Sequence, residues 1–299
     1  MRFIIYTPSY NDDVGGVVAL YKLCHMLRKH RQDAKIWLRH IPPGISCVQR
    51  FGRRMAAALG RYGGGRFDAP IVMDPSEVVD CVVIYPDIET GNPLGARNVV
   101  RWMLNKPDAF GQGGGVSPSD LVFLYHWVYF DPAYMGEDVK HNMLCIQNYR
   151  EDVYRQYNPI EGREGIAYCV RKGASREDID SALIENAVCI DGLPHERVAK
   201  VFNECKYFYS YDDYTAYLAY AAMCGCVPII IPVKGKSLEE WLPDATDRYG
   251  IAYGEENIDF AIETRPLILE KIKRSEREAE ENVRRFIATC AEYFNLPLK

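Results

Sequence analysis

Residues 211–215 place acidic, aromatic and hydroxyl side chains directly before a run of small residues that favours a helix. They are Tyr211, Asp212, Asp213, Tyr214 and Thr215, and the chain continues as "AYLAYAAMCGCVPIII". An acid at this place often only caps the helix, because the first turn has free N–H groups and a partial positive charge. The same side chains could instead contact a ligand. Both interpretations remain open for this stretch taken alone.

A second polar stretch, "VRKGAS", follows the apolar run "GIAYC". Arg171 and Lys172 stand there before a glycine, where we expect a strand to end and a helix capped by Ser175 to follow. Two adjacent cations suit a diphosphate, since arginine offers a planar fork of donors and lysine a point charge. Two cations on a protein surface need no ligand to explain them. The interpretation as a ligand site is therefore supported only when this loop is considered together with the other loops.

The loop "YTPSYNDDVGGVVALYKL" contains two adjacent glycines, Gly15 and Gly16, between an apolar run and an amphipathic helix. Glycine lets backbone N–H groups approach an anion at a helix start without a Cβ in the way. A simple turn would also use two glycines. Neither G-x-G-x-x-G nor G-x-x-x-x-G-K-[ST] occurs in this loop, which argues against a standard dinucleotide or P-loop site.

Apolar runs that alternate with amphipathic stretches must position these loops. The expected strands are "RFIIYT", "AKIWLR", "DCVVIYP", "DLVFLYHW", "NMLCIQN", "GIAYCVR", "NAVCIDG", "YFYSY", "VPIIIP" and "GIAYG". The expected helices lie near 15–30, 50–60, 94–105, 149–157, 176–185, 195–204, 215–224, 237–242 and 256–273. Near-continuous apolar strands between amphipathic helices are typical of parallel sheets covered on both faces. The sequence therefore predicts an α/β protein with two doubly wound, Rossmann-like domains.

The domain limits follow from length and from breaks in this pattern. A chain of 299 residues that is 48% hydrophobic can bury two cores. Pro159, Gly162 and Gly165 interrupt the pattern, so we expect an N-terminal domain at 1–157 and a second domain at 158–280. Residues 281–299 are expected to form a helix that packs back on the first domain.

Cysteine usage and hydropathy limit the class of protein. The ten cysteines include no Cys-x-x-Cys pair, and many lie within apolar runs, which indicates reduced thiols in a cytoplasmic protein. Only Cys224 and Cys226 are close in sequence, without a nearby histidine, so we expect no structural metal and no cofactor. No run reaches the length of a membrane span, and the N-terminus is expected to be a strand rather than a signal peptide.

A basic segment stands out in a chain whose formal net charge is −5. Between residues 22 and 66 there are eleven Lys or Arg and a single acid, Asp33. Its later part interleaves Arg50, Arg53 and Arg54 with apolar residues, a pattern that can lie on anionic lipid or meet an anionic substrate. A solvated helix face explains it equally well. The chain as a whole is acidic and contains no recognised nucleic-acid-binding motif, which argues against nucleic acid as a partner.

Taken together, these loops resemble the GT-B glycosyltransferases often called group 1. The resemblance rests on the Gly15–Gly16 loop, on "VRKG", and on "SYDDYT" followed by "AAMCGCVPII". In that family a strand is followed by an acid, then by a second acid about two helical turns further on, and then by small residues, Gly, Pro and an apolar strand. Asp213 falls at the first acid, and Gly225 and Pro228 fit. Ala221 falls at the second acid, which is a departure from the family.

The resemblance implies a metal-independent transfer of sugar from a nucleotide-diphosphate sugar to a saccharide or lipid-linked acceptor, in cell-surface polysaccharide synthesis. It implies two domains facing a cleft and retention of configuration. The cysteine usage and the basic segment add the expectation of a cytoplasmic enzyme that is peripheral to the inner face of the membrane. The first acid would lie near the donor sugar. The second would hold the ribose, a contact that Ala221 cannot make. The implied donor-binding residues are Gly15, Gly16, Arg171, Lys172, Tyr211, Asp212 and Thr215.

Acids of the first half are expected to serve the acceptor, whose hydroxyl loses its proton during attack. Asp87 and Glu89 follow the strand "VVIYP" and precede a helix expected near Pro93, and Asp12 and Asp13 lie in a neighbouring loop. Each could equally be a turn residue. His126 and His195 are further candidates, although lone histidines are more often structural. The sole Asp-x-Asp, at 178–180, is expected on a solvated helix face.

Two other functions remain open on the sequence. A sugar-nucleotide epimerase can share this fold, and it would need neither an acceptor surface nor a basic segment. A non-catalytic nucleotide-binding or scaffold module would explain Ala221 at the place of the second acid.

Overall fold

The computed structural model describes residues 1–40, 65–72, 75–107 and 116–297. The contacts of the chain define two compact units. Unit 1 consists of Met1–Asn148 and Ser275–Lys299, and unit 2 of Tyr149–Arg274. The boundary between the units therefore comes earlier in the chain than the expected break after residue 157.

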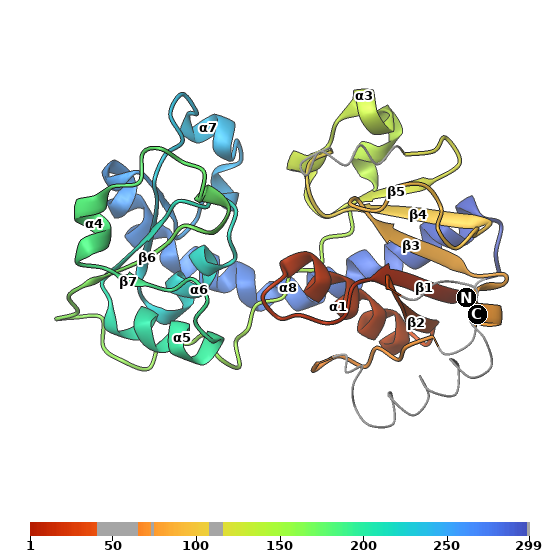
Figure 1. The fold of residues 1–299 in the computed structure, drawn as a ribbon, viewed down its shortest axis with the longest axis horizontal. Coiled ribbons are helices and arrows are strands. Elements are labelled where there is room, and N and C mark those ends of the chain that lie inside the picture. The colour runs from red at the N-terminus through yellow and green to blue at the C-terminus, as the bar shows by residue number, and fades with distance from the viewer. Residues whose placement is uncertain (41–64, 73–74, 108–115, 298–299) are drawn as a thin grey trace. The chain divides into compact units, whose positions relative to one another are not determined.

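Unit 1 is built on a five-stranded parallel sheet, in the order β2-β1-β3-β4-β5 (Figure 1). Its strands are β1 (Arg2–Thr7), β2 (Asp33–Leu38), β3 (Val82–Pro86), β4 (Asn98–Met103) and β5 (Leu121–Leu124). Helix α1 (Gly15–Lys29) packs on the sheet, and short helical turns follow at η1 (Pro75–Val78), η2 (Trp127–Tyr129), α3 (Pro132–Met135) and η3 (Glu137–His141). All residues of β3, β4 and β5 are buried, as expected for a sheet covered on both faces.

Unit 2 has a second parallel sheet of five strands, in the order β10-β9-β8-β6-β7 (Figure 1). Its strands are β6 (Ile166–Cys169), β7 (Val188–Cys189), β8 (Tyr207–Ser210), β9 (Val227–Ile230) and β10 (Ala252–Tyr253). Its helices and helical turns are η4 (Arg171–Gly173), α4 (Ser181–Glu185), α5 (His195–Glu204), α6 (Tyr217–Cys224), α7 (Leu238–Trp241), η5 (Ala245–Asp247) and η6 (Glu255–Asn257). The predicted fold class, α/β with two doubly wound parallel sheets, is confirmed.

The long helix α8 (Ile258–Tyr293) joins what the sequence predicts as two helices. It continues through Pro266, and its earlier part belongs to unit 2. Its later part fills the core of unit 1, where Phe286 lies 5.8 Å from Phe3 and 4.8 Å from Phe123 between ring centroids.

The helix predicted near residues 94–105 is wrong, because this segment forms the buried strand β4. The polar residues Asn98 and Arg101 lie within this strand, and both are less than 10% exposed and have partners inside the protein. Arg101 Nε lies 2.9 Å from Asp120 Oδ2, and its guanidinium packs over the Tyr85 ring. A paired arginine can therefore sit within a strand that the hydropathy pattern alone does not reveal.

Two further expected helices differ from the structure. Residues 149–157 contain a turn at 151–153 and are otherwise irregular, and Asn203 Oδ1 accepts hydrogen bonds from the N–H groups of Tyr157 and Asn158 at the end of this segment. The helix expected at 176–185 begins only at Ser181, where the Asp180 carboxylate caps it. The Asp-x-Asp is therefore not on a helix face, since Asp178 pairs with Arg176 at 2.6 Å and precedes the helix.

Some expectations lie outside the described residues. These are the helix near 50–60 and its basic residues Arg50, Arg53 and Arg54. Within the described residues, no helix is long and apolar enough to cross a membrane.

Candidate functional site

The strand order of unit 2 identifies where a ligand should bind. After β6 the chain forms β7 on one side of β6, and it then returns to form β8 on the other side. In open α/β sheets, ligands bind beyond the carboxyl ends of the strands at such a switch point. The loops that follow β6 and β8 begin at Val170 and Tyr211, so they carry most of the donor-site residues predicted from the sequence.

The loop after β6 presents both predicted cations at the surface. Arg171 and Lys172 are exposed and belong to the helical turn η4. Arg171 adopts a left-handed backbone conformation, with φ of 43°, and the Asp191 carboxylate accepts hydrogen bonds from the N–H groups of Val170 and Arg171. The Arg171 guanidinium lies 4.8 Å from the centroid of the Tyr217 ring, at the start of α6. This cation is thus held near the N-terminus of α6.

Gly173 allows the loops after β6 and β8 to touch. A Cβ at this position would lie 2.4 Å from the Tyr211 carbonyl oxygen. That is closer than any side chain tolerates, so the close approach of the two loops requires glycine.

Arg176 connects three loops from within the protein. Its guanidinium donates to the carbonyl oxygens of Tyr211 at 3.4 Å, Ile231 at 2.9 Å and Pro232 at 2.9 Å. It also stacks over the Tyr211 ring at 5.3 Å. One arginine thus ties the segment after η4 to the ends of β8 and β9, which fixes the carboxyl-end loops relative to one another.

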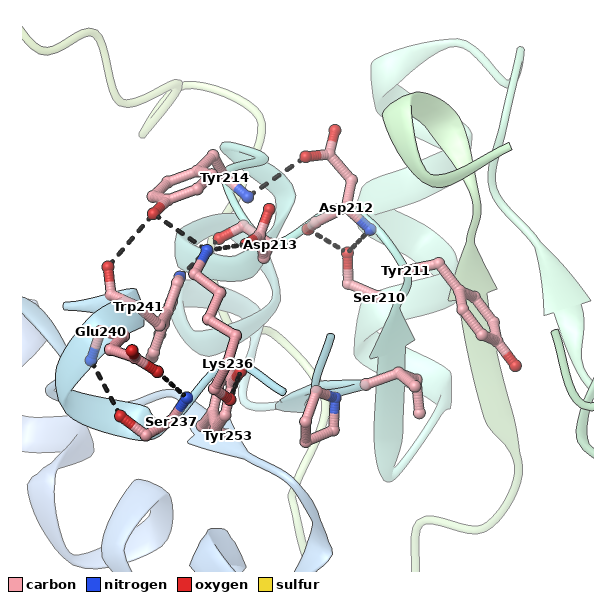
Figure 2. Close-up of polar contacts among 12 residues, drawn as sticks. Ser210, Tyr211, Asp212, Asp213, Tyr214, Lys236, Ser237, Glu240, Trp241 and Tyr253 are labelled. Carbon is pink, nitrogen blue, oxygen red and sulfur yellow. Dashed lines mark hydrogen bonds and ion pairs between the residues drawn. The ribbon is translucent and has the colours of Figure 1, made fainter. Parts of the chain in front are cut away.

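The loop after β8 separates the roles of its two acids. Asp212 is buried, and its Oδ1 accepts a hydrogen bond from the Tyr214 N–H at 3.1 Å, so it shapes the turn. Asp213 is partly exposed, and its Oδ2 lies 2.6 Å from Lys236 Nζ (Figure 2). Helix α6 has no side-chain cap at Ala216, and Thr215 Oγ1 accepts only a long bond of 3.4 Å from the Tyr217 N–H. Among the described residues Asp213 therefore pairs with a lysine rather than capping the helix.

Tyr211 belongs to the framework of the loop. Its ring is 2% exposed, and its hydroxyl accepts a hydrogen bond from the Asp180 N–H at 2.9 Å. In Figure 2 its side chain points away from Asp213 and Lys236. Asp213 and Thr215 thus lie in the segment before α6, and Arg171 contacts Tyr217 at the start of this helix. Tyr211 and Asp212 are buried in the same segment.

Sequence reasoning missed Lys236 and Arg176. Lys236 follows β9 in the run "VKGKS", and its distance from Asp213 along the chain hid the pairing. A cation in the loop after the apolar strand "VPIII" was the available signal, because the carboxyl ends of parallel strands meet at one edge of a sheet. Arg176 gave no such signal, since its role depends on three carbonyl groups.

Ala221 is fully buried in the core of unit 2, on the small-residue helix α6. An acid at this position would lie among apolar side chains, at a high desolvation cost. The departure from the resembled family at residue 221 is therefore consistent with the packing of α6. Gly225 ends this helix in the left-handed conformation, with φ of 86°.

The switch point of unit 1 lies between β1 and β3, because β2 and β3 flank β1 on opposite sides. Gly15 and Gly16 are the first two residues of α1 after the β1 loop, and no side chain caps this helix start at Val14. A Cβ at Gly15 would meet no atom of the described residues within 4 Å. The start of α1 therefore has room beside Gly15, and the anion site expected there stays a prediction.

Two acids follow β3 at the same edge, and they differ in their surroundings. Asp87 Oδ1 accepts a hydrogen bond from the Leu104 N–H at 3.0 Å, and burial raises the pKa of Asp87 above its usual value. Glu89 is 6% exposed, and burial raises its pKa against the opposing charges of Arg39 and Arg101. Arg39 Nε lies 2.8 Å from Glu89 Oε1, without the alignment of a directional hydrogen bond. Asp87 is the more accessible carboxylate.

The remaining predicted residues have local partners. Asp12 accepts a hydrogen bond from the Tyr10 hydroxyl, and the Asp13 N–H donates to Asn11 within the β1 loop. His126 Nδ1 accepts from the Val128 N–H, and His195 contacts the Tyr154 hydroxyl at 2.5 Å. The described residues include no cluster of His, Cys, Asp and Glu that could hold a metal ion.

A hollow of about 590 Å³ lies at the opposite edge of the unit 2 sheet. It is lined by residues 160–166, Lys206 and Tyr207, at the amino ends of β6 and β8. It is thus separate from the loops that follow these strands.

Comparison with protein-family models and with curated proteins finds no match to this chain. Solved structures with a similar arrangement include a putative UDP-N-acetylglucosamine 2-epimerase from Listeria monocytogenes, with 12% identity, a TM-score of 0.41, and coverage of 99% of this chain and 97% of that chain. Sucrose-phosphate synthase from Thermosynechococcus elongatus has 10% identity, a TM-score of 0.42, and coverage of 99% and 98%. Glycosyltransferase VinC in complex with dTDP has 11% identity, a TM-score of 0.39, and coverage of 98% and 99%. Because these TM-scores lie below 0.5, the likenesses assign neither a family nor an activity.

Proposed function

We propose that the chain is a glycosyltransferase that moves a sugar from a nucleotide-diphosphate sugar to a saccharide or lipid-linked acceptor. The observation that carries the proposal is the position of the predicted residues at the switch points of both sheets. In unit 2, the loops after β6, β8 and β9 bring two exposed cations, a partly exposed carboxylate and a lysine to one edge. This set of groups suits a ligand that combines a diphosphate with sugar hydroxyls.

In this proposal, Arg171 and Lys172 bind the donor diphosphate. Negative charge develops on the diphosphate as the bond between it and the anomeric carbon breaks. Cations that are already in place stabilise this charge without reorganisation. Asp213 Oδ1 is engaged by no other described residue, so it can accept a hydrogen bond from a donor-sugar hydroxyl.

Asp87 is the residue we propose for the acceptor. The acceptor oxygen forms the new glycosidic bond, and the carboxylate takes the proton of its hydroxyl. A raised pKa makes a carboxylate a stronger base, closer to the operating pH, which favours this role. Glu89 is less exposed than Asp87, and it lies beside Arg39. We therefore propose that Glu89 stabilises the loop and that Asp87 serves the acceptor.

A thermal-shift screen with UDP, GDP, TDP and their sugar derivatives tests the proposal. A ligand present at 100 times its dissociation constant should stabilise the fold by about 2.7 kcal/mol and would reveal the base. The stabilising sugar nucleotide should then yield a glycosylated product with an acceptor panel. Interconversion of sugar nucleotides without acceptor would instead indicate an epimerase, and the absence of any shift would favour a non-catalytic scaffold.

A further inference from the structure

Lys236 reaches Asp213 from a backbone that is fixed on both sides. The next residue, Ser237, caps α7 through a capping box: its Oγ accepts from the Glu240 N–H at 3.2 Å, and Glu240 Oε2 accepts from the Ser237 N–H at 2.7 Å. The carbonyl oxygen of Lys236 itself accepts a hydrogen bond from the Tyr253 hydroxyl at 2.7 Å. The ammonium of Lys236 therefore extends from a well-anchored position (Figure 2).

The backbone at Asp213 is fixed by separate contacts that do not involve its charge. Trp241 is 1% exposed, and its indole N–H donates to the Asp213 carbonyl oxygen at 2.9 Å. The Tyr214 hydroxyl donates to the Trp241 carbonyl oxygen at 3.1 Å, and the Trp241 ring stacks on Tyr253 with centroids 5.2 Å apart. Neutral hydrogen bonds and ring packing thus hold the β8 loop against α7 without the ion pair.

What the ion pair adds is a fixed direction for the Asp213 carboxylate. Lys236 Nζ engages Oδ2 at 2.6 Å and the Tyr214 hydroxyl oxygen at 3.3 Å, while Oδ1 has no hydrogen bond to another described residue. The side chains of Lys236 and Asp213 are 25% and 20% exposed, and pairs of this exposure contribute little to stability. A carboxylate held by one oxygen, with its other oxygen available, is suited to orient a hydroxyl.

We propose that Lys236 is a positioning residue of the donor site, which holds the Asp213 carboxylate toward the hydroxyls of the donor sugar. The inference rests on the proposed function and extends it to a residue from a third loop. It requires Lys236 to act on the sugar part of the donor through Asp213, and it requires the nucleoside diphosphate part to be recognised without Lys236. Transfer depends on placement of the reacting groups within fractions of an ångström.

The variant Lys236→Met keeps the length of the side chain and removes its charge. Calorimetry with the pairs UDP and UDP-glucose, and GDP and GDP-mannose, should show wild-type affinity for the nucleoside diphosphate and weaker binding of the matching sugar nucleotide. We expect kcat to fall by between about 10- and 100-fold, and KM for the sugar nucleotide to rise with its loss of affinity. Lys236→Arg should restore part of kcat, and Lys236→Met should add no further loss to Asp213→Asn, because paired residues are not additive.

Lys271→Met is the matched control. Lys271 Nζ lies 2.6 Å from Asp247 Oδ1 in the same unit, at 31% and 19% exposure, and donates a second bond to the Thr246 carbonyl oxygen at 3.3 Å. Its loss should leave binding and transfer unchanged. The inference is overturned if Lys236→Met behaves like this control, or if it weakens both ligands of a pair equally. If wild-type protein binds none of the nucleoside diphosphates and sugar nucleotides of the thermal-shift screen, the proposed function falls, and this inference falls with it.

Discussion

At the scale of single residues, Asp213 carries the most specific prediction. Asp213→Asn keeps the size of the side chain but removes the charge that Lys236 faces at 2.6 Å. We expect a loss of transfer of about 100-fold or more, as for other groups that stabilise a transition state, with the fold intact. Turnover measured with the natural donor, together with a melting curve, checks this outcome.

A capping role would give the opposite result for the same variant. Asparagine caps a helix about as well as aspartate, so the substitution would then be almost silent. Full turnover of Asp213→Asn would show that the carboxylate has a structural role only. Asp212→Asn is a comparison variant for Asp213→Asn. Asp212 Oδ1 accepts a hydrogen bond from the Tyr214 N–H at 3.1 Å, and the amide oxygen of asparagine can accept the same bond.

Asp87 allows a prediction of opposite effects on stability and activity. Burial raises its pKa, so the folded state binds a proton more readily than the unfolded state, and stability is lost as pH rises through the raised pKa. Asp87→Asn removes the buried charge and keeps an acceptor for the Leu104 N–H. We expect a higher melting temperature at pH 7, by about 2–4 °C for each kcal/mol gained, and reduced transfer.

The pH dependence provides the control for Asp87→Asn. Below the pKa of an unfolded aspartate, about 3.9, both proteins are uncharged at this position, and the difference in melting temperature should vanish. A variant that is less stable than wild type at pH 7 would contradict the assignment of a half-buried carboxylate whose charged form is destabilised by the fold.

At the scale of elements, the close approach of the loops after β6 and β8 predicts the effect of Gly173→Ala. The added Cβ would lie 2.4 Å from the Tyr211 carbonyl oxygen, so one loop must move. We expect a loss of stability of about 1–3 kcal/mol in urea unfolding, and weaker nucleotide binding. Gly15→Ala is the steric control, since no described atom lies within 4 Å of its added Cβ, and its stability should be unchanged or slightly raised.

The sequence predicted the strands and loops of unit 2 more accurately than their contacts. The apolar runs that became β6, β8 and β9, and the turn chemistry around them, are local features that a single sequence reveals. Lys236 and Arg176 act through partners far along the chain, so periodicity cannot identify them. The strand β4 was missed for a related reason, because Arg101 is neutralised by Asp120, a partner that no local pattern predicts.

At the scale of the whole molecule, two parallel sheets each place predicted residues beyond the carboxyl ends of their strands. The division of roles, with the donor at unit 2 and the acceptor at unit 1, is part of the proposal. Helix α8 belongs to both units, and its later part contributes Phe286 to the core of unit 1. Truncation within α8 would therefore remove core residues of unit 1.

The basic segment that includes Arg50, Arg53 and Arg54 lies outside the described residues, and its role stays a prediction. If it meets anionic lipid or a lipid-linked acceptor, flotation with anionic liposomes should recover the protein at low salt and release it at high salt. Equal recovery with neutral liposomes would exclude an electrostatic role.

The central claim is that a nucleotide diphosphate binds at the switch point of unit 2, against Arg171 and Lys172. The direct measurement is calorimetry of the best nucleoside diphosphate with wild type and with the double variant Arg171→Ala/Lys172→Ala. If each cation makes a charge-assisted bond of ordinary strength, the variant should lose about 2 to 4 kcal/mol of binding free energy. Unchanged affinity in a folded double variant would contradict the account.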